Sequence, residues 1–206
     1  MRKLMATVAC GLVAVALAGR VGVAAESKPD AEGFVQDWLV LGPIGNGDTS
    51  GPDALDAKQI PEEAALQPKA GGKQKVKDKE LVWKEAKVKD KEYYVDLAAT
   101  YPDEKDSVTG YMVAYVFADA ETKDVTVTMV SNDQGKLYMN GTEILKFAET
   151  RSTDKEGDKK EGVTLVKGRN TFVLKVVNEQ NDWTGGLRIT GKDGKPVAGL
   201  TVKTAP

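Results

Sequence analysis

Short runs of alternating residues, without a helical period, are the feature that most constrains the fold of this chain. In 111–117 (YMVAYVF) both sets of alternate residues are apolar, which is typical of a central strand that is covered on both faces. Residues 125–130 (VTVTMV) put apolar side chains on one side and threonine on the other, which predicts a half-buried strand. Residues 171–177 and 187–189 alternate in the same way. No long segment has helical periodicity, so we expect an all-β fold.

The clearest local signal is a hairpin at residues 137–144 (LYMNGTEI), where two alternating arms flank Asn140-Gly141. A two-residue hairpin turn needs positive φ at both positions, and Asn-Gly tolerates this best. The asparagine therefore needs no ligand to explain it. With seven or more strands separated by turns rich in glycine and aspartate, the chain is expected to form an antiparallel sandwich.

The first part of the domain gives weaker signals. Residues 34–42 (FVQDWLVLG) predict an opening strand that stops at Gly42-Pro43. Residues 45–58 are rich in Gly, Asp, Ser and Pro and are expected to form a loop. Residues 61–66 could form a short helix with proline in its first turn, and 93–97 a short strand. The sequence thus predicts at most one or two short helices.

Residues 1–25 have the layout of an export signal. A positive start (Arg2, Lys3) is followed by an uncharged apolar run over 4–19, and small residues stand at 23–25, so cleavage is expected after Ala25. The alternative is a membrane anchor, but the apolar run is at the short edge for spanning a bilayer. We therefore expect a bacterial protein that is exported to the periplasm or secreted, with no stable membrane span after cleavage.

The composition excludes several kinds of chemistry. The chain has no histidine, and its one cysteine, Cys10, leaves with the signal. Ser-His-Asp and Cys-His hydrolases are excluded because they need an imidazole, as are zinc and haem sites with histidine ligands. Cleavage reduces 29 basic residues to 26 against 31 acidic ones, a net charge of −5. Nucleic acid is therefore not expected as a partner.

The mature chain is expected to be one β-sandwich domain over 26–206, with a core at about 34–190 and a lysine-rich insertion at 69–92. The insertion holds nine lysines against five acids, and KVKDKE occurs in it twice. One interpretation is a basic patch for an anionic polysaccharide or a membrane surface. The other is a solvated hairpin whose lysines keep a sheet edge from pairing with another chain. We favour the hairpin because acids are interleaved with the lysines.

Four segments carry a wider pattern in a fixed order. They are Asp37–Pro43 (DWLVLGP); Ile60–Glu63 with Trp83 and Val95–Leu97; Ser131–Gly141 (SNDQGKLYMNG); and Leu165–Val176 with Trp183 and Leu187-Arg188. Together they resemble the galactose-binding-like jelly-roll domains found beside bacterial glycoside hydrolases and in large exported bacterial proteins. This resemblance implies an antiparallel jelly-roll β-sandwich and a non-catalytic carbohydrate-binding or accessory module. The chain departs from the pattern at Asn132, where an acid is usual, at the additional Gln134, and at Tyr138, where tryptophan is common.

The candidate binding residues come from two polar segments. Trp183 lies in the loop 178–186 (NEQNDWTGG), where an aromatic ring beside amide and acid groups suits a sugar. The other interpretation, which we favour for the ring itself, is that Trp183 closes the end of the core, as Trp38 and Trp83 are expected to pack within it. The predicted ligand-binding set, for a glycan or polysaccharide partner, is Asn132, Asp133, Asn181, Asp182 and Trp183.

Metal binding and catalysis have weaker support. A structural Ca²⁺ is an option at two loops, one with Asn46, Asp48 and Asp53 and one with Asp119, Glu121 and Asp124, but neither follows a known ligand spacing. No other cofactor is expected.

A glycosidase needs two carboxylates that face each other across a cleft, and the sequence identifies no such catalytic pair. The chain is therefore expected not to be an enzyme. A structural or protein-interaction domain of an envelope or extracellular assembly is the main alternative, and a small carboxylate-dependent glycosidase is the third.

Overall fold

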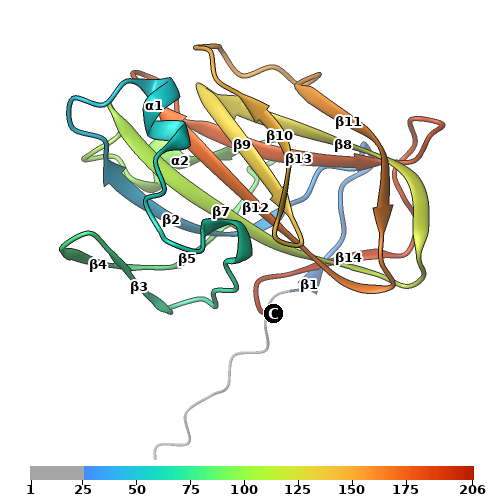
Figure 1. The fold of residues 1–206 in the computed structure, drawn as a ribbon. Coiled ribbons are helices and arrows are strands. Elements are labelled where there is room, and N and C mark those ends of the chain that lie inside the picture. The colour runs from blue at the N-terminus through green and yellow to red at the C-terminus, as the bar shows by residue number, and fades with distance from the viewer. Residues whose placement is uncertain (1–25) are drawn as a thin grey trace, which may run out of the picture.

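Two antiparallel sheets face each other in the structure, a computed structural model that describes residues 26–206 (Figure 1). The larger sheet has eight strands, six of them in the order β1-β14-β7-β12-β9-β10, with β2 paired to β7 and β5 paired to β2. The smaller sheet has four strands in the order β11-β8-β13-β6, and β3 and β4 form a separate hairpin. The all-β antiparallel sandwich is therefore confirmed. The predicted export signal at 1–25 lies outside the described residues.

The elements have the following bounds. The strands are β1 Glu26–Ser27, β2 Asp37–Gly45, β3 Lys73–Val76, β4 Lys79–Val82, β5 Lys84–Lys87, β6 Val95–Asp96, β7 Val108–Ala118, β8 Thr122–Asn132, β9 Gln134–Met139, β10 Thr142–Phe147, β11 Asp158–Leu165, β12 Gly168–Asn178, β13 Thr184–Thr190 and β14 Leu200–Lys203. The helices are α1 Gly51–Asp56, α2 Leu97–Thr100 and the 3₁₀ turn η1 Glu63–Ala65.

Strand β7 is the centre of the larger sheet. It pairs with β12 along its whole length, while β2 and β14 share its other edge. Its side chains alternate between two cores. Met112 and Val116 enter the core between the two sheets, and Tyr111 and Tyr115 enter a second core on the opposite face. This is why both sets of alternate residues in 111–117 are apolar.

The second core is covered by residues 51–83, which contain α1, η1 and the β3–β4 hairpin. We call this segment the cover. Ile60, Leu66 and Trp83 pack from this segment onto the larger sheet. The prediction of a loop over 45–58 was wrong, because α1 forms at Gly51–Asp56. Ser50 caps this helix by accepting a hydrogen bond from the Asp53 backbone, and a proline lies in its first turn.

Three other boundaries differ from the sequence predictions. Strand β2 does not stop at Gly42-Pro43 but runs to Gly45, with a shift in register between Leu41 and Ile44. Proline is tolerated at such an irregularity because no ladder hydrogen bond is required from it. The strand expected at 93–97 is reduced to β6, since α2 begins at Leu97. The sequence predicted no strand at Asp158–Leu165, where β11 forms, because two shifts in register with β8 interrupt its alternation.

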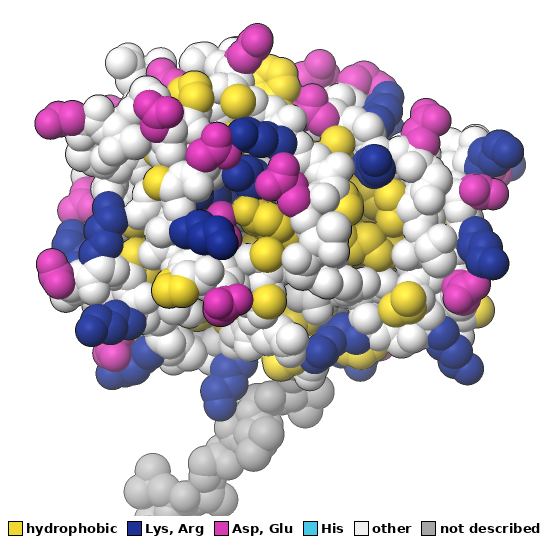
Figure 2. Space-filling view, viewed as in Figure 1, with side chains coloured by type: hydrophobic (Ala, Val, Ile, Leu, Met, Phe, Trp, Pro, Cys, Tyr) yellow, Lys and Arg dark blue, Asp and Glu magenta, His cyan; other side chains and the backbone are white. Residues whose placement is uncertain are grey.

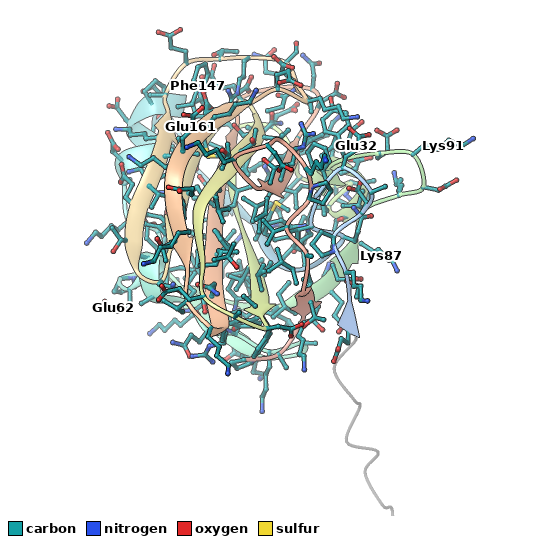
Figure 3. All side chains as sticks on the ribbon, turned by 90° about the vertical axis from the view of Figure 1, so that its right-hand side faces the viewer. Glu32, Glu62, Lys87, Lys91, Phe147 and Glu161 are labelled. Carbon is teal, nitrogen blue, oxygen red and sulfur yellow. The ribbon has the colours of Figure 1, made fainter. Side chains whose placement is uncertain are left out.

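The two predicted hairpins are both present. Asn140 and Gly141 adopt φ values of 50° and 85° between β9 and β10, as the turn requires. In the lysine-rich segment, β3 and β4 form a hairpin with an ion pair of 2.7 Å between Lys73 and Glu80. Figure 3 shows Lys91 projecting away from the body, and Figure 2 shows acidic and basic side chains interspersed over one face.

Strand β5 of the lysine-rich segment pairs with β2 at a sheet edge. Its sequence, KEAK, places lysine at both ends of this edge strand. Lysine at such a position disfavours pairing with another chain. The segment therefore has the arrangement of a solvated hairpin followed by a charged edge. Among residues 26–206, no helix combines the length and the apolar character needed to cross a membrane.

A buried ionic contact connects the cover to the larger sheet. The Nζ of Lys175, on β12, donates to the carbonyls of Leu55 (2.9 Å) and Ala57 (2.6 Å) and lies 3.4 Å from Oε2 of Glu63. Burial lowers the pKa of Lys175, and the charge of Glu63 opposes this shift. Tyr138 also donates to Glu63, at 2.7 Å. The polar groups of the cover are thus satisfied by the sheet beneath it.

At the edge of the same interface, Lys136 and Lys146 donate to the carboxylate of Asp56, each at 2.8 Å. These two hydrogen bonds hold the pKa of Asp56 at about 2. The ion pairs join the end of α1 to strands β9 and β10. The cover is therefore attached to the larger sheet at its edge through Asp56, as well as in its interior through the contacts of Lys175.

We expect Gly110→Ala to lower the free energy of unfolding by about 1–3 kcal/mol. A Cβ on Gly110 would overlap Cζ2 of Trp183, so the ring or the strand would have to move. Gly45→Ala is the matched control on the neighbouring strand, because a Cβ there meets nothing within 4 Å. Denaturant titration of both variants checks this, and equal stabilities would show that Trp183 does not pack on Gly110.

Alkaline pH is expected to unfold the protein. Burial raises the pKa of Tyr101, Tyr111, Tyr115 and Tyr138 above the ordinary value of 10.0. Above that pH the folded state therefore holds more protons than the unfolded state, so stability is full below about pH 10 and falls as the pH rises. Lys175 acts in the opposite direction, but it is one group against four.

The measurement is tyrosinate absorbance recorded together with far-ultraviolet circular dichroism during an alkaline titration. We expect most of the absorbance to appear only as the strands unfold. Full ionisation of the tyrosines while the dichroism stays native would contradict the burial of these hydroxyls.

Candidate functional site

Four of the five predicted site residues meet in a hollow at one end of the sandwich. The hollow has a volume of about 670 Å³ and lies where the β8–β9 corner approaches the loops that follow β10 and β12. Its lining residues are Asn132, Asp133, Thr150, Arg151, Ser152, Glu179, Gln180, Asn181 and Asp182. The fifth predicted residue, Trp183, is not among them.

Trp183 is fully buried, with 0% of its surface exposed. Its ring packs against the strand backbones at Gly42 and Gly110, where the missing side chains leave room for it, and it lies 5.8 Å from the ring of Tyr101. The ring therefore offers no face to a ligand, and its interpretation as a platform for a sugar was wrong. Trp183 closes the end of the core, which was the favoured interpretation of the ring, and Trp38 and Trp83 are buried as expected.

Asp133 joins the two principal segments of the hollow. Its Oδ2 accepts a hydrogen bond of 2.9 Å from the backbone N–H of Glu179, and its own N–H donates to the carbonyl of Val177 at 3.0 Å. The peptide between Asn132 and Asp133 is cis. The N–H of Ser107 donates to the carbonyl of Glu179 at 2.9 Å, so the loop after β12 is held from two sides.

Burial raises the pKa of Asp133, and the charge of Glu179 adds to this effect. The backbone N–H groups of Glu179, Arg151 and Gln180 oppose it by hydrogen bonding to the carboxylate. Asp133 is 4% exposed. Its carboxyl group therefore serves mainly as an acceptor that organises the surrounding backbone.

Arg151 is the basic residue that lines the hollow, and the protein itself occupies its guanidinium. Nη2 lies 2.7 Å from Oγ of Ser131 and 2.7 Å from Oδ2 of Asp158, and Nε donates to the carbonyl of Ser131 at 3.1 Å. The guanidinium also lies 3.9 Å from the ring centre of Phe147. Its charge is thus largely balanced within the wall, and the loop after β10 is fixed against β8.

Glu179 is held in the same way. Its Oε1 accepts hydrogen bonds from Nε2 of Gln134 at 2.7 Å and from Oγ1 of Thr150 at 3.3 Å. Gly51, at the start of α1, lies so close that a Cβ there would overlap Gln134 and Glu179. The additional Gln134 of the central segment is therefore a buried support of the site.

The groups left for a ligand are amides, hydroxyls and one carboxylate. Asn132 is 7% exposed, lines the hollow, and makes no side-chain hydrogen bond within residues 26–206. Gln180, Asn181 and Asp182 are exposed, and the N–H of Asn181 is fixed by Asp106 at 3.2 Å. No aromatic side chain lines the hollow.

Sequence reasoning missed five lining residues. Glu179 and Gln180 lie in the same polar loop as the residues that were identified, and their neighbourhood was the available signal. The sequence around Thr150, Arg151 and Ser152 gave no signal. These residues lie between β10 and β11, and they reach the hollow only because β10 pairs with β9 and β11 pairs with β8.

Several side chains of the two loops considered for Ca²⁺ have partners within the protein. Within residues 26–206, there is no group of three or more acidic, histidine or cysteine side chains placed to hold a metal ion. Oδ1 of Asn46 accepts a hydrogen bond from Thr109 at 2.7 Å, and Asp53 accepts one from Ser50 at 2.8 Å. In the other loop, Glu121 pairs with Lys123 at 3.4 Å. Asn46, Asp53 and Glu121 are therefore each bonded to a side chain outside the candidate sets, and Ca²⁺ binding at these loops stays a prediction.

Comparison with known proteins adds only distant likenesses. No family model and no curated protein matches the chain. Several solved structures are similar in part, and three of them are described here. A family 35 carbohydrate-binding module from an environmental isolate has 15% identity and a TM-score of 0.34, covering 50% of this chain and 77% of that one. The PA14 domain of the MpAFP antifreeze protein has 14% identity and a TM-score of 0.38, covering 82% and 87%.

The third structure is the GH31 alpha-xylosidase from Xanthomonas citri. It has 11% identity and a TM-score of 0.40, covering 87% of this chain and 18% of that one. Values at this level do not place the chain in a family. The fold and the hollow define an antiparallel β-sandwich with a polar pocket at one end.

We expect Trp183→Ala to lower the free energy of unfolding by about 3–5 kcal/mol, because it leaves a cavity at the end of the core. Its exposed neighbour gives the control, since Asp182→Ala should change stability by no more than about 0.5 kcal/mol. Thermal and denaturant unfolding measure both. A Trp183→Ala variant of unchanged stability would place the ring at the surface.

Proposed function

We propose that this protein is an exported, non-catalytic carbohydrate-binding module whose glycan site is the polar hollow. In this proposal the sandwich is of the galactose-binding-like jelly-roll type, and residues 1–25 direct export to the periplasm or the outside of a bacterial cell. The observation that carries the proposal is the meeting of Asn132, Asp133, Asn181 and Asp182 in one hollow, with the amide of Asn132 left without an internal partner.

The chemistry of the hollow suits a sugar. Sugar hydroxyls both donate and accept, and the amides and carboxylates of the lining offer complementary groups. A volume of about 670 Å³ lies within the range of about 300–1,000 Å³ that is usual for small-molecule sites. Because no aromatic ring lines it, recognition would rest on hydrogen bonds.

The hollow contains carboxylates, but their arrangement favours binding over catalysis. Glycoside hydrolysis uses one carboxyl as acid and a second as base or nucleophile. Here Asp133 accepts from the backbone of Glu179, and Glu179 accepts from Gln134 and Thr150. Both carboxyls are thus committed to holding the loop, and the proposal assigns no catalytic residue.

A structural or protein-interaction domain is the second candidate. The burial of Trp183 and the lack of an aromatic platform in the hollow favour it, because both remove a common means of holding a sugar. In that case the polar end of the sandwich would contact another protein of an envelope or extracellular assembly. The two candidates differ in whether isolated glycans bind.

Asn132→Ala is expected to weaken glycan binding by up to about tenfold, the value of one hydrogen bond. Its stability should not fall, because the amide has no internal partner to lose. Isothermal titration calorimetry against neutral, cationic and anionic oligosaccharides measures the binding, after a glycan array has selected them. Gln74→Ala on the β3–β4 hairpin is the control, and it should bind as the unmodified protein does.

The absence of binding to every oligosaccharide tested would overturn the proposal and favour the second candidate. Equal binding by the unmodified protein and Asn132→Ala would show that glycans bind elsewhere. The non-catalytic assignment would be contradicted if the unmodified protein released sugar from a panel of glycoside substrates and the Asp133→Asn variant did not.

A further inference from the structure

The hollow has an excess of negative charge that bears on the ligand. We propose that it selects glycans that carry protonated amines, such as glucosamine polymers, over neutral glycans, and that it rejects uronic acids. This inference rests on the proposed function, and it names the class of sugar that the same site would take.

The first observation is the balance of charge. Three carboxylates line the hollow, on Asp133, Glu179 and Asp182, against the one guanidinium of Arg151. Arg151 is paired with Asp158 at 2.7 Å, so it adds little positive charge to the space that a ligand would enter. Asp106 lies just behind the loop, where it accepts from the N–H of Asn181. A uronate would therefore meet like charges without a free cation to offset them.

The second observation is that two acceptor side chains without an internal partner in the described range line the hollow. Asp182 is exposed and makes no ion pair within residues 26–206. Asn132 is 7% exposed and lines the same space. Its side chain has no hydrogen-bond partner within the described range. A protonated amine has three donors and no acceptor, so it can bond to the carboxylate and to the amide oxygen together.

The ligand that fits the hollow is an organic cation and not a metal ion. The described residues contain no group of three or more acidic side chains that converges on one point. The carboxylates are instead distributed around a hollow of about 670 Å³, and two of them are already bonded to Glu179 N–H, Gln134 and Thr150. Such spacing fits a ligand with the dimensions of sugar rings.

The experiment measures calorimetric binding of three oligosaccharides of equal length at a mildly acidic pH. They are a glucosamine oligomer, its N-acetylated counterpart and a galacturonic acid oligomer. We expect the glucosamine oligomer to bind best, the N-acetylated one more weakly and the uronic acid not at all. Added salt should reduce the preference for the amine, because it screens exposed charges.

Asp182→Asn removes the charge and keeps the shape. It should weaken binding of the glucosamine oligomer by about threefold, as expected for one exposed charge pair, and weaken binding of the N-acetylated oligomer by less, because the amide keeps an acceptor for a neutral sugar. The control is Glu62→Gln, which removes one exposed charge from the cover. Figure 3 shows Glu62 at the opposite end of the view from Phe147, whose ring contacts Arg151 of the hollow. It should leave both affinities unchanged.

The outcomes separate the two proposals. Equal binding of the amine and N-acetylated oligomers, unaffected by Asp182→Asn, would overturn the charge selection while the glycan-binding function stands. Binding of none of the three, with none on the array, would overturn the function and this inference with it. Binding of pentalysine as tightly as the glucosamine oligomer would show a general amine site, and tight Ca²⁺ binding would show a metal site. Either result would contradict selection of an amino sugar.

Discussion

The burial of Trp183 between the two sheets is the contact on which the polar end of the sandwich depends. Its ring fills the space that Gly42 and Gly110 leave on adjacent strands, and this fixes the point at which the chain enters β13. Residues 179–182 must then cross the end of the sandwich at the surface, where Asp133 holds them through the N–H of Glu179. The hollow is thus a consequence of core packing, and its polar groups are positioned by a side chain that no ligand touches.

The cover over the other face of the larger sheet supports the same region. Lys175 and Glu63 are buried together where residues 51–66 meet the sheet, and Lys175 also satisfies two carbonyls at the end of α1. A buried ion pair of this kind contributes little net stability, but removing one partner is costly, so it specifies how the cover docks. The start of that cover, Gly51, lies against Gln134 and Glu179. Both cores therefore contribute to the shape of the hollow.

The sequence predicted the parts of the structure that local chemistry decides. Two-residue alternation located the central strands, and Asn140-Gly141 located a hairpin, because positive φ is a local requirement. It did not predict that β2 continues past Pro43, which depends on an irregular register with β7. The polar composition of loop 178–186 identified Asn181 and Asp182, and core packing was the favoured interpretation of Trp183. The sequence did not show which residues receive the ring, since Gly42 and Gly110 lie far away in the chain. Arg151 was missed for the same reason.

In the function that we propose, the hollow beside this buried tryptophan binds a glycan. Nuclear magnetic resonance of the labelled protein, titrated with the oligosaccharide that binds best, tests it most directly. We expect the perturbed backbone amides to cluster at residues 132–133, 150–152 and 179–182. Perturbations confined to the lysine-rich segment 69–92, or spread without a cluster, would contradict it.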